Sequence, residues 1–143
     1  MDIFDAFKIS SSALKAQRIR LNTISSNLAN IETTRTPEGG PYKKRMVVFQ
    51  SSESPFEQRL EQSLKGAVQG VEVAGIQASG KAPRMIHNPA HPDADEQGFV
   101  AMPDINLIEE MVDMNSAARA YEANVTVVKS AKRMALKALE IGR

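Results

Sequence analysis

Apolar residues recur every seven positions at both ends of the chain. The first row near the N-terminus is Phe7, Leu14, Leu21 and Leu28, and its companion row is Ile3, Ser10, Gln17, Ile24 and Ile31. Two such rows three or four residues apart lie on one side of a helix, as in coiled coils. Residues 3–31 contain neither Gly nor Pro. They are therefore predicted to form one amphipathic helix that ends near Asn30, because Asn tolerates the left-handed conformation that closes many helices.

The C-terminal segment repeats this pattern over a greater length. Its first row is Leu107, Met114, Tyr121, Val128 and Ala135, and its second row is Met111, Ala118, Val125, Lys132 and Leu139. Residues 105–140 contain neither Gly nor Pro, so the pattern predicts one helix throughout. Asp104, directly after Pro103, is the expected N-cap.

The middle of the chain has shorter periods and many breakers. Residues 33–41 read as a loop, and 42–50 as a strand centred on Met46–Phe49. Ser54 to Glu57 has the form of a capping box with Pro at the first helical position, which predicts a short helix over 55–65. Further short strands are expected at Val71–Val73, Met85–Ile86 and Phe99–Met102, and a loop over His87–Gln97.

These elements predict a mainly α protein. Two long terminal helices, paired as an antiparallel coiled coil, would form one discontinuous helical domain from residues 1–36 and 104–143. Residues 37–103 would form a small β-rich middle region with the short helix. A helix of about 36 residues projects well past any globule that such a middle region can form. The apolar rows therefore favour an interaction role.

Composition excludes several classes of function. The net charge of +1 gives no electrostatic support to nucleic-acid binding. The absence of cysteine excludes disulfides, thiolate metal sites and a cysteine nucleophile. No run of about 18 apolar residues is present to span a membrane, and no basic, then apolar, leader is visible at the N-terminus. We expect no enzyme activity, no metal and no cofactor.

Three segments carry weak chemical signals. Gly75 to Lys81 has the spacing of a phosphate-binding loop, but Ala82 stands where a magnesium-binding Ser or Thr belongs, so a surface turn is expected. His87, His91, Asp93, Asp95 and Glu96 could be pictured as a metal cluster, but Pro89 and Pro92 remove the rigid helix that would preorganise it. Lys43-Lys44-Arg45 is interpreted as a solvated strand edge.

Two motifs resemble those of a known family. Ser25 to Asn30, with Thr33 and Thr34, is similar to the Asn-rich motif of bacterial flagellar rod and hook proteins. Ala118 to Val128, with Tyr121 and Asn124, is similar to their C-terminal motif. Chain length, Gly40–Gln50 and Gly98–Pro103 resemble the FlgC family of proximal rod proteins. The family motif residues are Ser26, Asn27, Leu28, Ala29, Asn30, Tyr121 and Asn124.

The resemblance implies a structural subunit of the flagellar basal-body rod that transmits torque in the periplasm. Its partners would be copies of itself, other rod proteins and, without a cleaved leader, the flagellar type III export apparatus. The alternative from the residues alone is a non-flagellar coiled-coil adaptor. The expected assembly seam is Phe7, Leu14, Leu21, Leu28, Met111, Met114, Ala118, Tyr121, Val125 and Val128. The polar exceptions Ser10, Gln17 and Lys132 are candidates for choosing neighbours.

Overall fold

The computed structural model describes residues 3–52 and 69–141, and the helix predicted over 55–65 lies outside these ranges. Within the described ranges, six elements follow one another. They are α1 (Ile3–Ala29), β1 (Arg45–Ser51), β2 (Val71–Ala78), β3 (Arg84–His87), β4 (Phe99–Met102) and α3 (Leu107–Ile141). Two long helices and a small antiparallel region between them thus confirm the predicted class.

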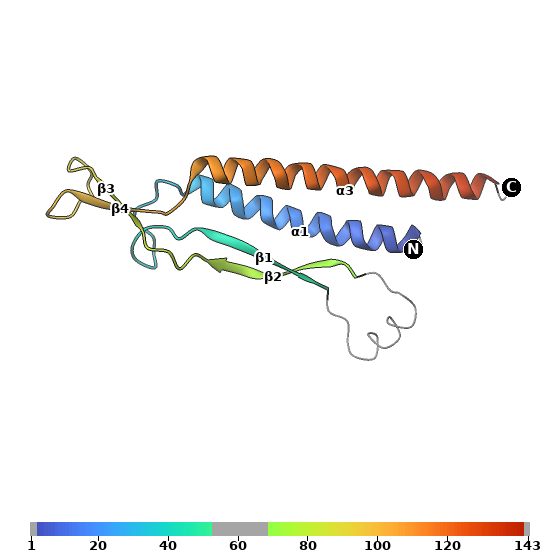
Figure 1. Cartoon of the computed structure of the whole chain (residues 1–143), viewed down its shortest axis with the longest axis horizontal. Helices are drawn as coiled ribbons and strands as arrows, with labels where there is room; N and C mark the ends of the chain where they lie inside the picture. The colour runs from blue at the N-terminus through green and yellow to red at the C-terminus, as the bar shows by residue number, and fades with distance from the viewer. Residues whose placement is uncertain (1–2, 53–68, 142–143) are drawn as a thin grey trace.

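The molecule is a long rod in which α1 and α3 lie side by side and run in opposite directions (Figure 1). Helix α3 has 35 residues and α1 has 27. At about 1.5 Å per residue this difference corresponds to roughly 12 Å. The C-terminal end of α3 accordingly extends past the start of α1 (Figure 1).

The face of α3 that packs on α1 consists mainly of small and polar residues. Its buried positions are Glu110, Ala117 and Ala131. Half-buried Asn124 belongs to the same row. Each of these positions immediately precedes a position of the row predicted from Met111, Ala118 and Val125. The other predicted row, Met114, Tyr121, Val128 and Ala135, is half-buried beside them. Small side chains let two helices approach closely, which a search for large apolar residues overlooks.

Strands β1 and β2 form an antiparallel hairpin that packs along α1. Val48 pairs with Gly75 and Phe49 pairs with Val73, so Ala74 is the extra residue of a β-bulge. Val71 N donates to Ser12 Oγ of α1 at 3.1 Å. Gly70 is needed beside this bond, because a Cβ there would lie 2.6 Å from Ser12 Oγ. The predicted turn at Gly75–Lys81 is wrong in its first half, since residues 75–78 pair with β1.

Strands β3 and β4 form a second antiparallel pair, in the register Arg84 with Met102 through His87 with Phe99. The loop between them turns at Gly98, where φ is +76°. Asp95 Oδ1 accepts hydrogen bonds from the backbone N–H groups of Gln97 and Phe99. Both predicted strands and the intervening loop are confirmed, although His87 belongs to β3.

The predicted end of α1 near Asn30 is confirmed, since the helix ends at Ala29. The conformation predicted for Asn30 and the N-cap predicted for α3 are wrong. Among the described residues only glycines have positive φ, so Asn30 does not close α1 in a left-handed conformation. Its Nδ2 instead donates to the carbonyl oxygen of Ser26 at 2.8 Å. At α3 the N-cap is Asn106, whose Oδ1 accepts from Ile108 N at 3.0 Å. Asp104 lies outside the helix with its carboxylate 3.8 Å from Lys81 Nζ.

Candidate assembly surface and polar joint

A buried asparagine connects α1, β1 and α3. Asn27 Nδ2 donates to Arg45 O at 2.9 Å and to Glu110 Oε2 at 3.0 Å. Its Oδ1 accepts from Arg45 N at 2.9 Å and from Tyr42 Oη at 3.2 Å. Both amide hydrogens and both acceptor sites of Asn27 are therefore used. We call Asn27, Tyr42, Lys44, Arg45 and Glu110 the polar joint.

Glu110 is the charged centre of the polar joint. It is 1% exposed, and Lys44 Nζ lies 2.7 Å from its Oε1. The hydrogen bond to Glu110 raises the pKa of Lys44 above its ordinary value of 10.5, burial opposes this rise, and the charge of Glu110 adds to it. A buried carboxylate needs such partners, because an unpaired charge inside a protein is costly. The interpretation of Lys44 as part of a solvated edge is thus wrong.

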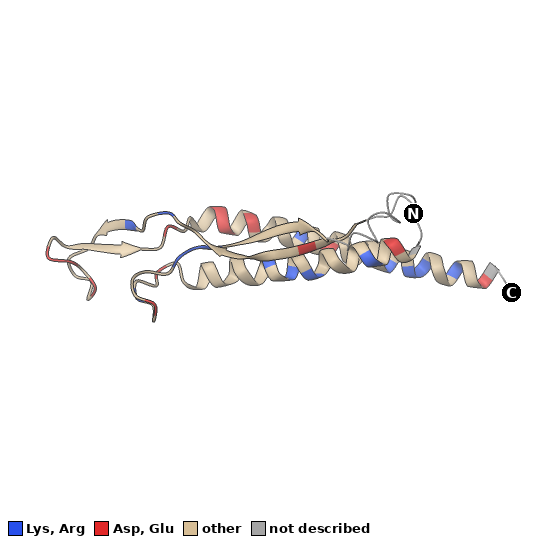
Figure 2. Cartoon of the chain, turned by 90° about the horizontal axis from the view of Figure 1, so that it is seen from below, with Lys and Arg blue, Asp and Glu red and all other residues tan. Residues whose placement is uncertain are grey.

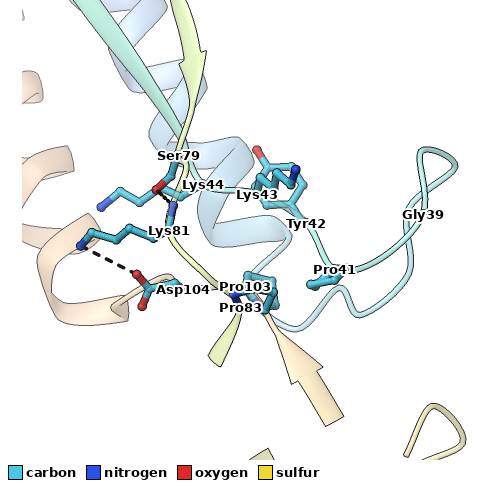
Figure 3. A pocket seen from close by; sticks show the side chains of 10 residues that line it. All are labelled: Gly39, Pro41, Tyr42, Lys43, Lys44, Ser79, Lys81, Pro83, Pro103 and Asp104. Atoms are coloured by element: carbon cyan, nitrogen blue, oxygen red, sulfur yellow. Dashed lines mark hydrogen bonds and ion pairs between the residues drawn. The ribbon is translucent and has the colours of Figure 1, made fainter. Parts of the chain in front are cut away.

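Two of the spaces beside the polar joint are lined by Lys44. A cavity of about 300 Å³ lies between α1, β1 and α3, where Arg20 pairs with Asp113 at 3.2 Å. A smaller pocket of about 60 Å³ lies where the 39–44 segment meets Ser79–Pro83 and Pro103–Asp104 (Figure 3). Its walls are prolines and lysine stems, and the Lys81–Asp104 contact crosses its rim (Figure 3). The charged groups that line the larger space pair with one another, Lys44 with Glu110 and Arg20 with Asp113.

Two of the predicted apolar rows lie on the side of the helix pair opposite the β1–β2 hairpin, namely the α1 row that contains Leu14 and Leu21 and the α3 row that contains Met111. Ser12, Ala16 and Ile19 of α1 line a cavity of about 410 Å³ against β2. Leu14 and Leu21 are two residues away from these positions, about 200° around the helix, and therefore face the other way. On α3 the same relation holds between Asp113, which faces β1, and Met111.

The two rows form one surface, which we call the apolar flank. Its α1 members are half-buried, as are its two smaller α3 members, whereas Met111 is 54% exposed. The members are Phe7, Leu14, Leu21, Leu28, Met111, Ala118 and Val125. The remaining seam positions, Met114, Tyr121 and Val128, point toward α1 and are half-buried within the subunit. The structure thus separates the predicted seam into an internal and an external part.

The family motif residues have different local roles. Asn27 belongs to the polar joint, Asn30 caps the Ser26 carbonyl, and Thr33 Oγ1 donates to Asn30 Oδ1 at 3.1 Å. Leu28 is half-buried and Ala29 is exposed. On α3, Asn124 Nδ2 donates to Ala120 O at 2.8 Å, and Tyr121 is half-buried. The motif therefore ends α1 and ties it to the middle region.

The residues considered for a metal cluster stabilise a loop. His91 Nδ1 accepts from Asp93 N at 3.1 Å, and Asp93 contacts Thr34 and Arg35 on the loop after α1. His87 packs edge-on against Phe99 with ring centroids 5.1 Å apart. Within residues 3–52 and 69–141, no three His, Asp or Glu side chains are arranged to hold a metal. In the same ranges, no helix is long and apolar enough to cross a membrane.

Charge is sorted along α3 (Figure 2). Acidic residues lie near its start and basic residues follow in its C-terminal half (Figure 2). This order complements the helix dipole, which favours acids at the N-terminal end and bases at the C-terminal end. It also gives the two ends of the helix opposite surface charge.

Four members of the polar joint escaped prediction from the sequence, namely Tyr42, Lys44, Arg45 and Glu110. Glu110 is one of two acids in the first turn of α3, and acids at a helix N-terminus are usually solvated. The one available signal was its position in the heptad, since Glu110 is seven residues before Ala117 and on the side that faces α1. Its partners are 83 and 66 positions away along the chain, so only folding brings them together.

Comparison with known proteins gives the family. Residues 7–35 match the family described as "Flagella basal body rod protein", and residues 96–141 match "Flagellar basal body rod FlgEFG protein C-terminal". The flagellar basal-body rod protein FlgC of Borreliella burgdorferi is 42% identical over 99% of the chain and 98% of its own length. The FlgC proteins of Bacillus subtilis and Salmonella typhimurium are 41% and 38% identical over the full length of both chains.

These full-length similarities favour a rod protein over a general coiled-coil adaptor. They extend through the middle region as well as the helices, so they do not reflect heptad periodicity alone. The two matched family regions cover α1 with its Asn-rich end, and α3 with the strand before it. The chain therefore belongs to the FlgC family of structural proteins of the bacterial flagellar basal-body rod.

Proposed function

We propose that this subunit polymerises through α1 and α3 to form the proximal part of the rod and that it transmits torque by packing. The observation that carries this proposal is the apolar flank. It runs along both helices on the side away from the β1–β2 hairpin, and Met111 within it is 54% exposed. Apolar side chains that remain accessible along one side of a subunit mark an interaction site. In the assembled rod, neighbouring subunits would cover it.

Within the subunit, the helix pair is an antiparallel coiled coil in this proposal. Positions 110, 114, 117, 121, 124, 128 and 131 of α3 alternate at spacings of four and three and are buried or half-buried. This is the spacing of a coiled-coil seam. The helices would lie along the axis of the assembly, with the β1–β2 hairpin on their outer side.

The polar joint would hold the hairpin at a fixed angle to the helices. Asn27 bonds both the backbone of β1 and the side chain of Glu110. Relative rotation of the two parts would break several hydrogen bonds and expose Glu110, which is 1% accessible. Because rotation would cost this free energy, the polar joint should deform little under load. Torque transmission requires such stiffness.

The remaining parts of the proposal concern partners and location. Partners are copies of this chain and other rod proteins in the periplasm, and the subunit arrives through the flagellar type III export apparatus. The FlgC relatives carry the word rod in their names, which supports a place in that assembly. No enzymatic step is part of the proposed function.

A pair of matched substitutions tests the role of the apolar flank. Met111→Asp places a charge on that surface, and Met85→Asp places the same charge on β3 at a site of similar exposure, 54% against 55%. We expect Met111→Asp to be exported and folded but absent from isolated basal bodies, with loss of motility. Met85→Asp should be incorporated. Normal incorporation and motility with Met111→Asp would refute assembly through this surface.

A further inference from the structure

The large apolar side chains that α3 exposes gather at its two ends. At the start, Leu107, Ile108, Met111 and Val112 are 50–71% exposed. At the other end, Met134, Leu136 and Leu139 are 52–72% exposed. Between these groups, Val127 is the only large hydrophobic residue of α3 that is similarly exposed. Exposed apolar clusters on a structural protein indicate contacts with other molecules.

The two clusters carry opposite charge. Glu109 and Asp113 lie beside the first cluster in the sequence, and Lys132, Arg133 and Lys137 lie beside the second. Lys137 pairs with Glu140 and Asp113 pairs with Arg20. Within residues 3–52 and 69–141, Glu109, Lys132 and Arg133 form no salt bridge. Their charges are therefore available to a neighbour.

These two ends cannot meet within one subunit. The 24 residues from Glu109 to Arg133 span about 36 Å along a straight helix at about 1.5 Å per residue. The second end also extends past the start of α1 (Figure 1), so the partner helix of the same chain leaves it uncovered. Both halves of a complementary contact are thus present on one helix but held apart.

We propose that the basic end of α3 in one copy docks beside the acidic start of α3 in a second copy, head to tail. Ile108 and Val112, one helical turn apart, would pack against Met134 of the neighbour, with Arg133 near Glu109. The occupant is a second copy of this chain, because the complementary charge and apolar clusters belong to the same helix. A contact between two different surface patches continues from copy to copy, which produces a helical assembly. This inference rests on the proposed function.

Cysteine cross-linking tests the contact directly, because the chain has no native cysteine to give background. Full-length Val112→Cys and Met134→Cys proteins are purified separately, mixed and oxidised. We expect a covalent dimer that forms only in the mixture. A mixture of Met85→Cys with Met134→Cys is the matched control, since Met85 is 55% exposed and lies on β3. Equal yields in the two mixtures would overturn the proposal.

Charge reversal supplies an independent measurement. Arg133→Glu should weaken association of the full-length chain by about fivefold to tenfold, since it replaces an attraction by a repulsion of similar size. Combining it with Glu109→Arg should restore association. Glu96→Arg, in the β3–β4 loop, is the control for a change of net charge and should have no effect. Failure of the double reversal to restore association, with each variant folded, would contradict the pairing.

The outcomes separate this contact from the proposed function. If Arg133→Glu associates normally, cross-links normally and enters basal bodies, the head-to-tail contact is wrong while a rod function stands. If the wild-type chain is absent from basal bodies, the rod function fails, but the cross-link between Val112 and Met134 still measures the contact. Dimer formation that decreases as salt rises would support the charged pairing.

Discussion

Asn27 of α1 donates a hydrogen bond to Glu110 of α3 over 3.0 Å, and each of these residues is 1% exposed. The same asparagine bonds the backbone of Arg45 at the start of β1. One side chain in the Asn-rich motif therefore sets how two helices and a hairpin meet. This gives the motif a physical role within the subunit, in addition to any contact with neighbours.

Replacing Asn27 by Asp should destabilise the subunit strongly. The change removes the amide donors to Arg45 O and Glu110 Oε2 and places a second carboxylate beside the buried one. We expect the free energy of unfolding to fall by about 3 kcal/mol or more, as when a buried charge loses its partner. Chemical denaturation followed by circular dichroism measures this change.

Asn22→Asp is the matched control for this substitution, because Asn22 is on the same helix but exposed. It should change the free energy of unfolding by less than about 0.5 kcal/mol, as is usual for surface sites. Equal effects at positions 22 and 27 would show that the polar joint contributes little.

Removing the cation of the polar joint should also destabilise the subunit. Lys44→Met leaves Glu110 buried without its ion-pair partner at 2.7 Å. We expect a loss of about 3 kcal/mol at neutral pH. Adding Glu110→Gln should recover part of this loss, because the neutral amide no longer requires a cation. A double-mutant cycle measures the coupling, and strictly additive losses would contradict it.

The Lys44–Glu110 ion pair should be lost at alkaline pH, when Lys44 loses its proton. The pKa of Lys44 is raised above 10.5 in the folded subunit, chiefly by its hydrogen bond to Glu110. The contribution of protonated Lys44 to the stability of the folded subunit is therefore complete below pH 10.5. It is lost as the pH rises through the folded-state pKa of Lys44. The stability difference between wild type and Lys44→Met should be constant at neutral pH and shrink above about pH 10.5. A difference that grows there would contradict the assignment.

Gly70→Ala should loosen the hairpin from α1. The new Cβ would lie 2.6 Å from Ser12 Oγ, which accepts the hydrogen bond from Val71 N. To avoid this clash the hairpin must move away from Ser12, and the lost hydrogen bond would lower the free energy of unfolding by about 1 kcal/mol. Gly80→Ala is the control, since nothing lies within 4 Å of a Cβ there. Hydrogen exchange at Val71 should increase in the first variant alone.

Gln17→Leu should raise the stability of the isolated subunit while disturbing its assembly. The Oε1 atom of Gln17 is buried and has no hydrogen-bond partner in the part of the chain that the structure describes. An apolar side chain of similar size removes this unsatisfied group, whose burial lowers the free energy of unfolding by about 1–3 kcal/mol. We expect a higher unfolding midpoint with normal export but reduced motility. An unchanged midpoint together with unchanged motility would count against both roles of Gln17.

The helices and most strands were predictable because local pattern determines them. Heptad spacing and the absence of Gly and Pro located α1 and α3 within a few residues, and short apolar runs between breakers located β1, β3 and β4. The caps at Asn30 and Asn106 were not predictable in detail, because several neighbouring polar residues compete for each position. Whether Gly75 to Ala78 formed a turn or a strand depended on pairing with β1.

The sequence alone determined that two long amphipathic helices precede and follow a small β-rich region along the chain, and its motifs indicated the family. Only the tertiary structure decided which apolar row faces the partner helix and which remains on the outside of the helix pair. That choice depends on small residues such as Ala117 and Ala131, whose size permits close approach but leaves little mark on a hydrophobic pattern. The union of Asn27, Lys44 and Glu110 likewise required folding, because hydrogen bonds and ion pairs depend on proximity in space rather than on spacing along the chain.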